Sequence, residues 1–453
     1  MTATLTLRTL LFSHLLLVLF QIPLRAIIID TTYLRDVLLW CTLGLWIIIF
    51  SMEKRQNIIL NSLDVLIIIY LSYGVLTFIL CIYNGLGIVE AGREFRNYFL
   101  PAALYFVAKN VFTTYRNRNK LINFIFIVFI FYVFDVLIEF LFIKSGFSVY
   151  SIPWYSYIFK ISERYIGNMT GIPGYILPEY TPVLGLLGWP NATAAVLAAL
   201  FAFIYPYHST KVTSIQEDAK RNLASYVGTW EWRGIVIIMF LALIILHVTT
   251  HLLSAILVML LISFFMRNRL LFCFIIIVCL ATVLLSTLYY DASPFFVFMH
   301  QDFIGTDSSL SSLNLILSIG QINVIIDASI YNLLFGGINI SGSDMDMAGG
   351  FEMRLLLFTA RFGILWLLLF LSIYLNGFII ARKIIKNCNY QKSAYYFSIG
   401  SIGLLLVCLL DMGHYARPLF YPLFDLWAII LGALSATYAS IMPQNRYLMK
   451  RNV

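Results

Sequence analysis

The chain has 453 residues, of which 61% are hydrophobic and only 11% are charged, and its formal net charge is +8. Soluble domains carry about 25% charged residues, so this composition excludes an ordinary soluble protein and makes the lipid bilayer the expected solvent. The positive charge is explained below by membrane topology, and we expect no nucleic-acid partner.

Long apolar runs predict about twelve membrane-spanning helices. The expected fold is therefore an all-α, polytopic membrane helix bundle, with residues 1–453 forming a single integral membrane domain. In chain order the approximate limits are 9–28, 36–52, 60–83, 97–113, 121–143, 183–205, 234–248, 252–266, 270–289, 354–380, 394–412 and 418–440. A tight turn in "LHVTTHLLSAIL" (246–257) separates two of the short spans.

The distribution of positive residues predicts the topology. With the N-terminus in the cytoplasm, twenty of the 30 Lys and Arg residues fall on the cytoplasmic side. This bias follows the positive-inside rule and places the N- and C-termini in the cytoplasm. The outer side carries two long loops, about 144–182 and about 290–353. Loops of that length usually have a function, so the outer face is where we expect the active site.

The two outer loops differ in character. The first contains "YSIPWYSYIF" and is rich in aromatic residues, which suit either an interfacial belt or stacking on sugars. In the second, "SSLNLILSIGQINVIIDASI" predicts an amphipathic helix on the outer leaflet. A glycine-rich stretch, "LFGGINISGSDMDMAGG", follows and lacks the spacing of an EF-hand. The six cysteines show no metal or disulfide spacing, and we expect neither a metal nor a cofactor.

Arginines mark the start of the span 354–380. Arg354 and Arg361 are seven residues apart, so a helix would place them on one face, with Arg361 about two turns in. A guanidinium at that depth needs an anion or a watery cavity. The alternative is that it pairs with an acidic side chain or snorkels to the surface. The same alternatives apply to Arg93 and Arg96, which share a helical face next to acidic residues.

Three stretches in this order resemble the O-antigen ligase and polysaccharide polymerase family. They are "LGLLGWPNATAAVLAAL" (184–200), "HVTTHLLSAILVML" (247–260), and "LLFGGI" (333–338) with "EMRLLLFTARFGILW" (352–366). The resemblance spans roughly residues 180–440, so the family-like catalytic core is 183–440, including the outer loop 290–353.

Two departures favour the polymerase branch. The family's ligases commonly have His-Asn where this chain has Glu352 and Met353, and an Arg where it has Leu253. The resemblance implies a metal-independent glycosyltransferase of the bacterial inner membrane with an active site facing the periplasm. It would join undecaprenyl-pyrophosphate-linked glycans, with a chain-length regulator and a flippase as partners. The alternatives are an O-antigen ligase acting on lipid A core and, from another class, a lipid-linked oligosaccharide flippase.

Attack at the anomeric carbon expels a lipid diphosphate, so the reaction needs cations at the leaving group and a base for the attacking hydroxyl. Arg354 and Arg361 are the expected cations, and Glu352 is the expected base, with His300 and His414 as the other candidates. The expected substrate-binding residues are Arg93, Arg96, Arg164 and Arg417.

Overall fold

The protein is all-helical throughout the part of the chain that the structure describes, with no strand there. The computed structural model describes residues 2–21, 23–24, 31–52, 60–83, 85–144, 185–187, 190–209, 223–225, 227, 229–246, 249–266, 330–336, 354–388, 392–414 and 423–451. The expected all-α class is therefore confirmed over these residues. A helix satisfies its own backbone hydrogen bonds, which a lipid solvent requires.

The helices follow the apolar runs of the sequence. They are α1 (Thr2–Leu19), α3 (Thr31–Met52), α4 (Ser62–Tyr83), α5 (Ile88–Tyr98), α6 (Leu104–Val111), α7 (Tyr115–Lys144), α9 (Pro190–Ile204), α10 (Thr229–Ile245), α11 (Thr249–Phe265), α16 (Ile330–Phe335), α18 (Arg354–Asn387), α19 (Lys392–His414) and α20 (Leu423–Arg451). Short 3-10 turns are Leu100–Ala103, Tyr205–Ser209 and Leu223–Ser225.

Six of the described helical segments are long and apolar enough to cross a membrane. They are Tyr33–Met52, Ser62–Tyr83, Tyr115–Leu141, Arg361–Asn387, Ser393–Leu410 and Leu423–Ile441, and each falls on a predicted span. These helices fit a multi-pass membrane protein. The count of about twelve spans stays a prediction, and the expected span 270–289 lies outside the described residues.

The prediction of one continuous helix over 97–113 is wrong. Helix α5 ends at Tyr98, a 3-10 turn contains Pro101, and α6 begins only at Leu104. Proline has no backbone N–H and cannot continue the hydrogen-bond ladder of the preceding helix. The polar helix α5 is thereby separated from the apolar α6 that packs in the core.

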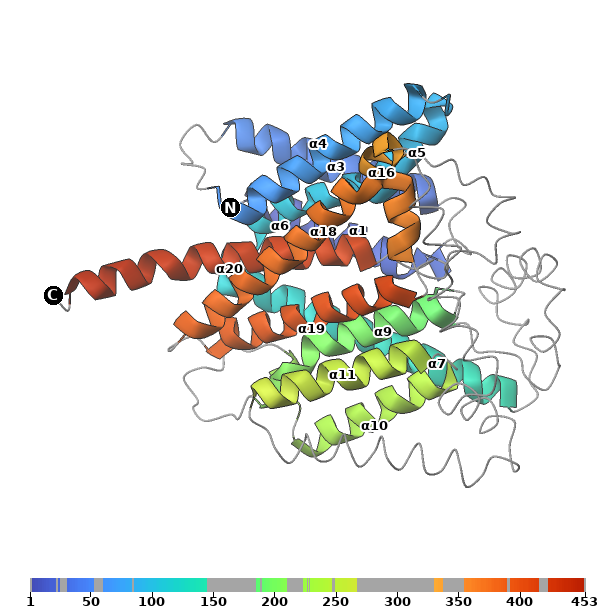
Figure 1. The fold of residues 1–453 in the computed structure, drawn as a ribbon. Helices are drawn as coiled ribbons and strands as arrows, with labels where there is room; N and C mark the ends of the chain where they lie inside the picture. The colour runs from blue at the N-terminus through green and yellow to red at the C-terminus, as the bar shows by residue number, and fades with distance from the viewer. Residues whose placement is uncertain are drawn as a thin grey trace.

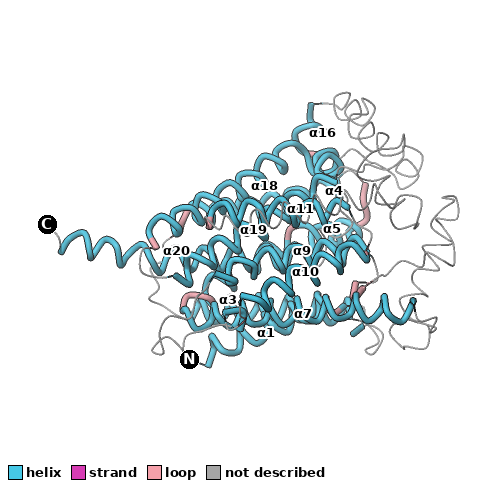
Figure 2. The backbone as a smooth tube through the Cα atoms, turned by 90° about the horizontal axis from the view of Figure 1, so that it is seen from below, coloured by secondary structure: helices cyan, strands magenta, loops and turns pink. Residues whose placement is uncertain are grey.

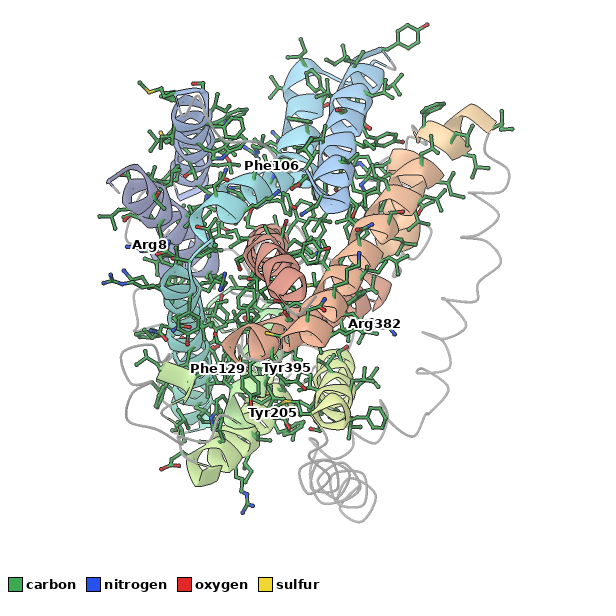
Figure 3. The ribbon with its side chains drawn as sticks, turned by 90° about the vertical axis from the view of Figure 1, so that its left-hand side faces the viewer. Arg8, Phe106, Phe129, Tyr205, Arg382 and Tyr395 are labelled. Carbon is green, nitrogen blue, oxygen red and sulfur yellow. The ribbon has the colours of Figure 1, made fainter. Side chains whose placement is uncertain are left out.

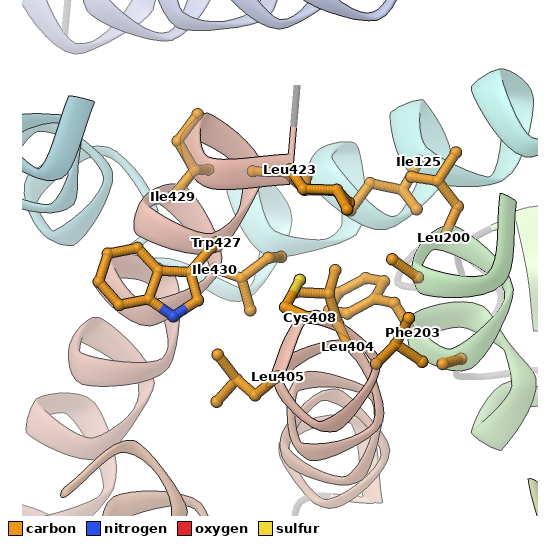
Figure 4. Packing of buried hydrophobic residues seen from close by; sticks show 14 of the residues in the cluster. Ile125, Leu200, Phe203, Leu404, Leu405, Cys408, Leu423, Trp427, Ile429 and Ile430 are labelled. Carbon is orange, nitrogen blue, oxygen red and sulfur yellow. The ribbon is translucent and has the colours of Figure 1, made fainter. Parts of the chain in front are cut away.

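Helix α20 lies in the middle of the bundle when the molecule is seen along the helices (Figure 3), and it packs against α6, α18 and α19. Its Trp427 is buried against Phe370 and Tyr374 of α18, while Ile430 points toward α19, whose Leu404 and Cys408 face Leu200 and Phe203 of α9 (Figure 4). The buried hydrophobic residues thus form one continuous core that extends across the bundle.

Glycines allow some of these helices to approach closely. A Cβ at Gly432 of α20 would lie 2.3 Å from the carbonyl oxygen of Tyr105 on α6. One at Gly400 of α19 would lie 2.2 Å from the carbonyl oxygen of Phe203 on α9. Small residues at helix contacts are typical of membrane bundles, where close backbone packing replaces the hydrophobic effect as the driving force.

Both chain termini lie at the same end of the bundle (Figures 1 and 2). Near that end the buried carboxylate of Asp64 is fully paired, because it accepts hydrogen bonds from Lys109 at 2.6 Å and Tyr105 at 2.7 Å. Asn61 donates its backbone N–H to the same group and its side-chain amide to Ser435. This network joins α4, α6 and α20 and leaves Asp64 with a structural role.

Candidate functional site

Charged side chains gather at the end of the bundle opposite the termini. Helix α5 lies there, and α3, α18 and α20 begin there (Figure 1). Their interactions form two sets: Arg361 pairs with Glu94, and Asp36 pairs with Arg35 and Arg96, with the charge of Asp425 acting on Arg35. The charged group consists of Arg35, Asp36, Glu94, Arg96, Arg361 and Asp425. Each of its three guanidinium groups has a carboxylate within ion-pair distance, so an incoming anion has to compete with an internal one.

Two glycines shape the region around Arg361. Helix α18 is broken at Gly363, whose φ is 84° and ψ is 164°, a conformation open essentially only to glycine. A Cβ there would lie 2.2 Å from the carbonyl oxygen of Leu334, at the end of α16. Gly336, with φ 81°, lies equally close to the carbonyl oxygen of Arg361. The predicted continuous helix 354–380 is therefore wrong at Gly363, because α16 packs into the break.

The break gives Arg361 a defined place. Arg354 begins α18, as predicted, so Arg361 sits at the end of a short helical segment directly before the break. The carbonyl group of Phe362 accepts a hydrogen bond from the hydroxyl of Tyr73 on α4. A side chain thus satisfies a backbone group that the interrupted ladder leaves without a partner. The segment that carries Arg361 is held by α4 on one side and by α16 on the other.

Arg361 pairs with Glu94. One guanidinium nitrogen lies 2.7 Å from Glu94 Oε1, and 38% of the Arg361 side chain remains exposed. The guanidinium also lies over the ring of Tyr98, with its carbon 5.8 Å from the ring centroid. Of the two expected situations, pairing with an acidic neighbour is confirmed for this residue. A guanidinium carries five N–H donors, and Glu94 Oε1 is the acidic oxygen paired with it, so the partly exposed side chain is accessible to a second anion.

Glu94 is the more buried partner, with 17% of its side chain exposed. Its second oxygen, Oε2, is buried without a hydrogen-bond partner. Burial raises the pKa of Glu94 above its ordinary value, while the positive charges of Arg361 and Arg93 act in the opposite direction. The guanidinium neighbours thus favour the ionised form of this carboxyl group, and burial opposes it.

Asp36 joins two more arginines on the α3 side. It lies 2.7 Å from Arg96 of α5 and 2.9 Å from Arg35, its neighbour in sequence. Arg93, by contrast, is exposed, although it shares α5 with Arg96. The expected alternative of pairing with an acidic side chain is therefore found for Arg96, while the charge of Arg93 acts on Glu94. Asp36 was not predicted as a site residue, although it stands beside an arginine at the start of an apolar run, which is the pattern that could have indicated it.

One member of the charged group, Asp425, also lies close to a buried histidine. His14 of α1 and Asp425 of α20 are almost fully buried, with His14 Nε2 3.6 Å from Asp425 Oδ1. The charge of Asp425 also acts on Arg35. Asp425 is an acidic residue at the start of an apolar run that the sequence analysis did not single out, and the tertiary fold brings it to Arg35.

Several predicted site residues cannot be placed beside this group. Glu352, His300, Arg164 and Arg417 lie outside the described residues. Arg354 begins α18 and His414 ends α19, and the structure describes only the backbone of these two residues. Within the described part of the chain, no group of three or more His, Cys, Asp or Glu side chains could hold a metal ion.

One helix start near the predicted motifs is as expected. Helix α9 begins at Pro190, in the "GWPN" stretch, and the Gly185 N–H preceding it donates to the buried Glu139 at 2.8 Å. Helix α10 ends at Ile245 and α11 begins at Thr249, and the predicted tight turn between them lies partly outside the described residues. Comparison with protein-family models gave no match, and comparison with curated proteins gave none either. The resemblance therefore rests on the residues themselves.

This arrangement can bind an oxyanion and move a proton. A guanidinium presents parallel N–H donors that suit phosphate oxygens. An adjacent carboxylate with a buried, unpaired oxygen can accept a proton from a hydroxyl group. The two functions lie side by side at Arg361 and Glu94.

Proposed function

We propose that this chain is a bacterial envelope polysaccharide polymerase. It joins undecaprenyl-pyrophosphate-linked oligosaccharide repeat units on the periplasmic face of the inner membrane, without a metal. The proposal includes about twelve spans, cytoplasmic termini and two long periplasmic loops, the second with an amphipathic helix. A flippase and a chain-length regulator are the expected protein partners.

One observation carries the proposal: a partly exposed guanidinium, Arg361, at the charged end of an apolar bundle. An arginine in such surroundings is costly unless it binds an anion or another charge. Glycines from two separate motifs, Gly336 and Gly363, pack together directly beside it. The two glycine-containing segments therefore meet in the structure at Arg361, the only arginine of α18 that lies at the break.

The proposed reaction uses this guanidinium at the leaving group. A sugar hydroxyl of one repeat unit attacks the anomeric carbon of the glycan carried on undecaprenyl pyrophosphate. The bond to the diphosphate breaks, and the negative charge that develops on the diphosphate is stabilised by fixed arginines. A preorganised arginine is always charged, so this step needs no metal.

The test is the lipopolysaccharide pattern of a Gram-negative host that normally makes a full ladder. Deleting the gene is expected to leave core carrying a single repeat unit, because repeat units can no longer be joined. Electrophoresis of the lipopolysaccharide checks this. Bare core with long lipid-linked glycan would instead identify a ligase. Bare core with single repeat units facing the cytoplasm would identify a flippase, and either result would contradict the proposal.

Complementation with variants tests the site. Arg361→Lys is expected to lower polymer formation by about 100-fold, because lysine keeps the charge but loses the paired N–H donors. Glu352→Gln is expected to remove the ladder if Glu352 is the base. The matched control is Arg382→Lys, an exposed arginine on the same helix at the other end of the bundle (Figure 3). It should leave the ladder unchanged, and normal ladders with both site variants would disprove the site.

A further inference from the structure

We propose that the Arg361–Glu94 ion pair is an exchangeable latch: the lipid diphosphate takes the place of Glu94 on Arg361, and the released Glu94 accepts the proton of the attacking hydroxyl. This inference rests on the proposed function and assigns a second acidic residue to it. It differs from the sequence-based expectation that Glu352 acts as the base.

The geometry supports an exchange rather than a permanent pair. Glu94 reaches Arg361 through Oε1 alone, at 2.7 Å, while Oε2 has no hydrogen-bond partner. The contact joins two different helices, α5 and α18, so it can open without unwinding either helix. A permanent, purely structural pair would be expected to satisfy both oxygens of a buried carboxylate, as the network around Asp64 does.

Arg361 can be reached by a new anion. More than a third of its side chain is exposed, whereas Glu94 is largely buried on the other side of the pair. A diphosphate carries more negative charge than a carboxylate and offers several oxygens, so it competes well for the guanidinium. The ring of Tyr98 lies against Arg361 and belongs to α5, so it can keep the guanidinium in place while its acidic partner changes.

The exchange would prepare Glu94 for proton transfer. Burial raises the pKa of Glu94, and the charge of Arg361 is the largest influence that lowers it. When the diphosphate neutralises Arg361, the effect of burial dominates, and the carboxylate becomes a stronger base. Binding of the diphosphate would thus raise the basicity of Glu94 at the stage when the attacking hydroxyl has to lose its proton.

The step balances in atoms and electrons. The acceptor hydroxyl oxygen forms a bond to the anomeric carbon and gives its proton to Glu94. The bond between that carbon and the diphosphate oxygen breaks, and the diphosphate leaves with the electron pair. Its added charge is met by Arg361, and Glu94 releases the proton to water once the diphosphate departs.

The test uses the full chain in lipid nanodiscs, with undecaprenyl diphosphate as the binding probe and lipid-linked repeat units as the polymerisation substrate. Glu94→Gln is expected to bind the probe about three- to tenfold more tightly, because the competing charge is gone. The same variant is expected to polymerise about 100-fold more slowly or worse, because no base remains. Tighter binding with slower turnover is a combination that a structural defect would not produce.

The matched control is Glu90→Gln, which removes the same charge one turn earlier on α5 from an exposed position. It should change neither binding nor turnover. Glu94→Asp keeps a proton acceptor and should be at least tenfold more active than Glu94→Gln. Thermal melting of each variant verifies folding. If Glu94→Gln does not fold, the binding and turnover of Glu94→Asp are compared with those of the wild type instead.

The possible failures are distinguishable. If the wild-type chain neither binds undecaprenyl diphosphate nor forms polymer, the proposed function fails and this inference fails with it. If the wild type does both but Glu94→Gln polymerises normally, or binds the probe more weakly, only the latch is overturned. Equally low turnover in Glu94→Gln and Glu94→Asp would likewise overturn the proton-accepting role.

Discussion

At the scale of single residues, Arg361 is where sequence and structure meet most closely. The sequence predicts an arginine in an apolar helix that needs a charged partner, and the structure provides Glu94 at 2.7 Å. The sequence also places Glu94 near Arg93 and Arg96, but it contains no signal for which arginine Glu94 would contact. That choice depends on how α5 lies against α18, which is a tertiary property.

Cys81 offers a residue-scale test of ligand binding beside Arg361. This half-buried thiol of α4 lies close enough to Glu94 and Arg361 for both charges to act on it. In a variant that keeps Cys81 as its single cysteine, undecaprenyl diphosphate is expected to slow labelling by a membrane-permeable maleimide several-fold, because the bound diphosphate restricts access. The labelling rate is measured by mass spectrometry.

The control is a variant that keeps only Cys41, an exposed cysteine of α3. Its labelling rate should not respond to the diphosphate. Equal protection of both cysteines would point to a general effect on the bilayer, and no protection of Cys81 would contradict diphosphate binding at Arg361.

At the scale of elements, the break in α18 decides where Arg361 lies. Aromatic residues at every fourth position run along this helix and pack on one another on both sides of the break, and Phe370 and Tyr374 also pack on Trp427 of α20. These residues are Phe358, Phe362, Trp366, Phe370, Tyr374 and Phe378. Their periodicity predicts a helix correctly, but it continues through Gly363 and so conceals the break. In the structure, the break lies where α16 approaches Gly363 closely.

Gly363→Ala tests the importance of the break. A methyl group would meet the carbonyl oxygen of Leu334 at 2.2 Å, and the backbone conformation itself excludes alanine. We expect a loss of about 1–3 kcal/mol in stability and loss of polymer formation, because α16 and Arg361 would be displaced. Thermal melting in detergent and the lipopolysaccharide ladder measure the two effects.

Gly44→Ala is the matched control, since no atom lies within 4 Å of a Cβ built there and the residue sits within α3. Alanine is the better helix former, so this change should leave stability equal or slightly higher. A Gly363→Ala protein that melts like the control would show that the region relaxes without cost.

At the scale of the whole molecule, the two ends of the bundle differ in what they carry. Both termini lie at one end of the bundle, as an even number of crossings requires, and the candidate site lies at the other end (Figure 1). The positive-inside rule predicts that the end with the termini faces the cytoplasm. The candidate site would then face the periplasm, where lipid-linked repeat units are joined.

Reporter fusions test this topology. Green fluorescent protein at the C-terminus is expected to fluoresce, and alkaline phosphatase there is expected to be inactive, because both report a cytoplasmic end. Alkaline phosphatase inserted within 144–182 or within 290–353 should be active. Enzyme activity in whole cells measures each fusion, and the reverse pattern would place the candidate site in the cytoplasm and rule out the proposed reaction.

The sequence by itself determined the solvent, the helical class and the position of most described helices. These follow from composition and from the length of apolar runs, because a bilayer accepts few alternatives to a long apolar helix. The sequence also indicated that the arginines and the glycine-containing stretches near the start of the span 354–380 belong to the candidate site. Where proline or glycine interrupts an apolar run, at Pro101 and Gly363, hydropathy alone could not show the interruption.

The tertiary structure alone decided which charges meet. Glu94 with Arg361, Asp36 with Arg96, and His14 with Asp425 are each contacts between helices far apart in the chain. Helical periodicity defines a face but not the helix that covers it, since lipid and protein neighbours are equally apolar. The packing of α5 and α16 against α18 makes the pairing specific, and that packing depends on the shapes of side chains and on close approach at glycine.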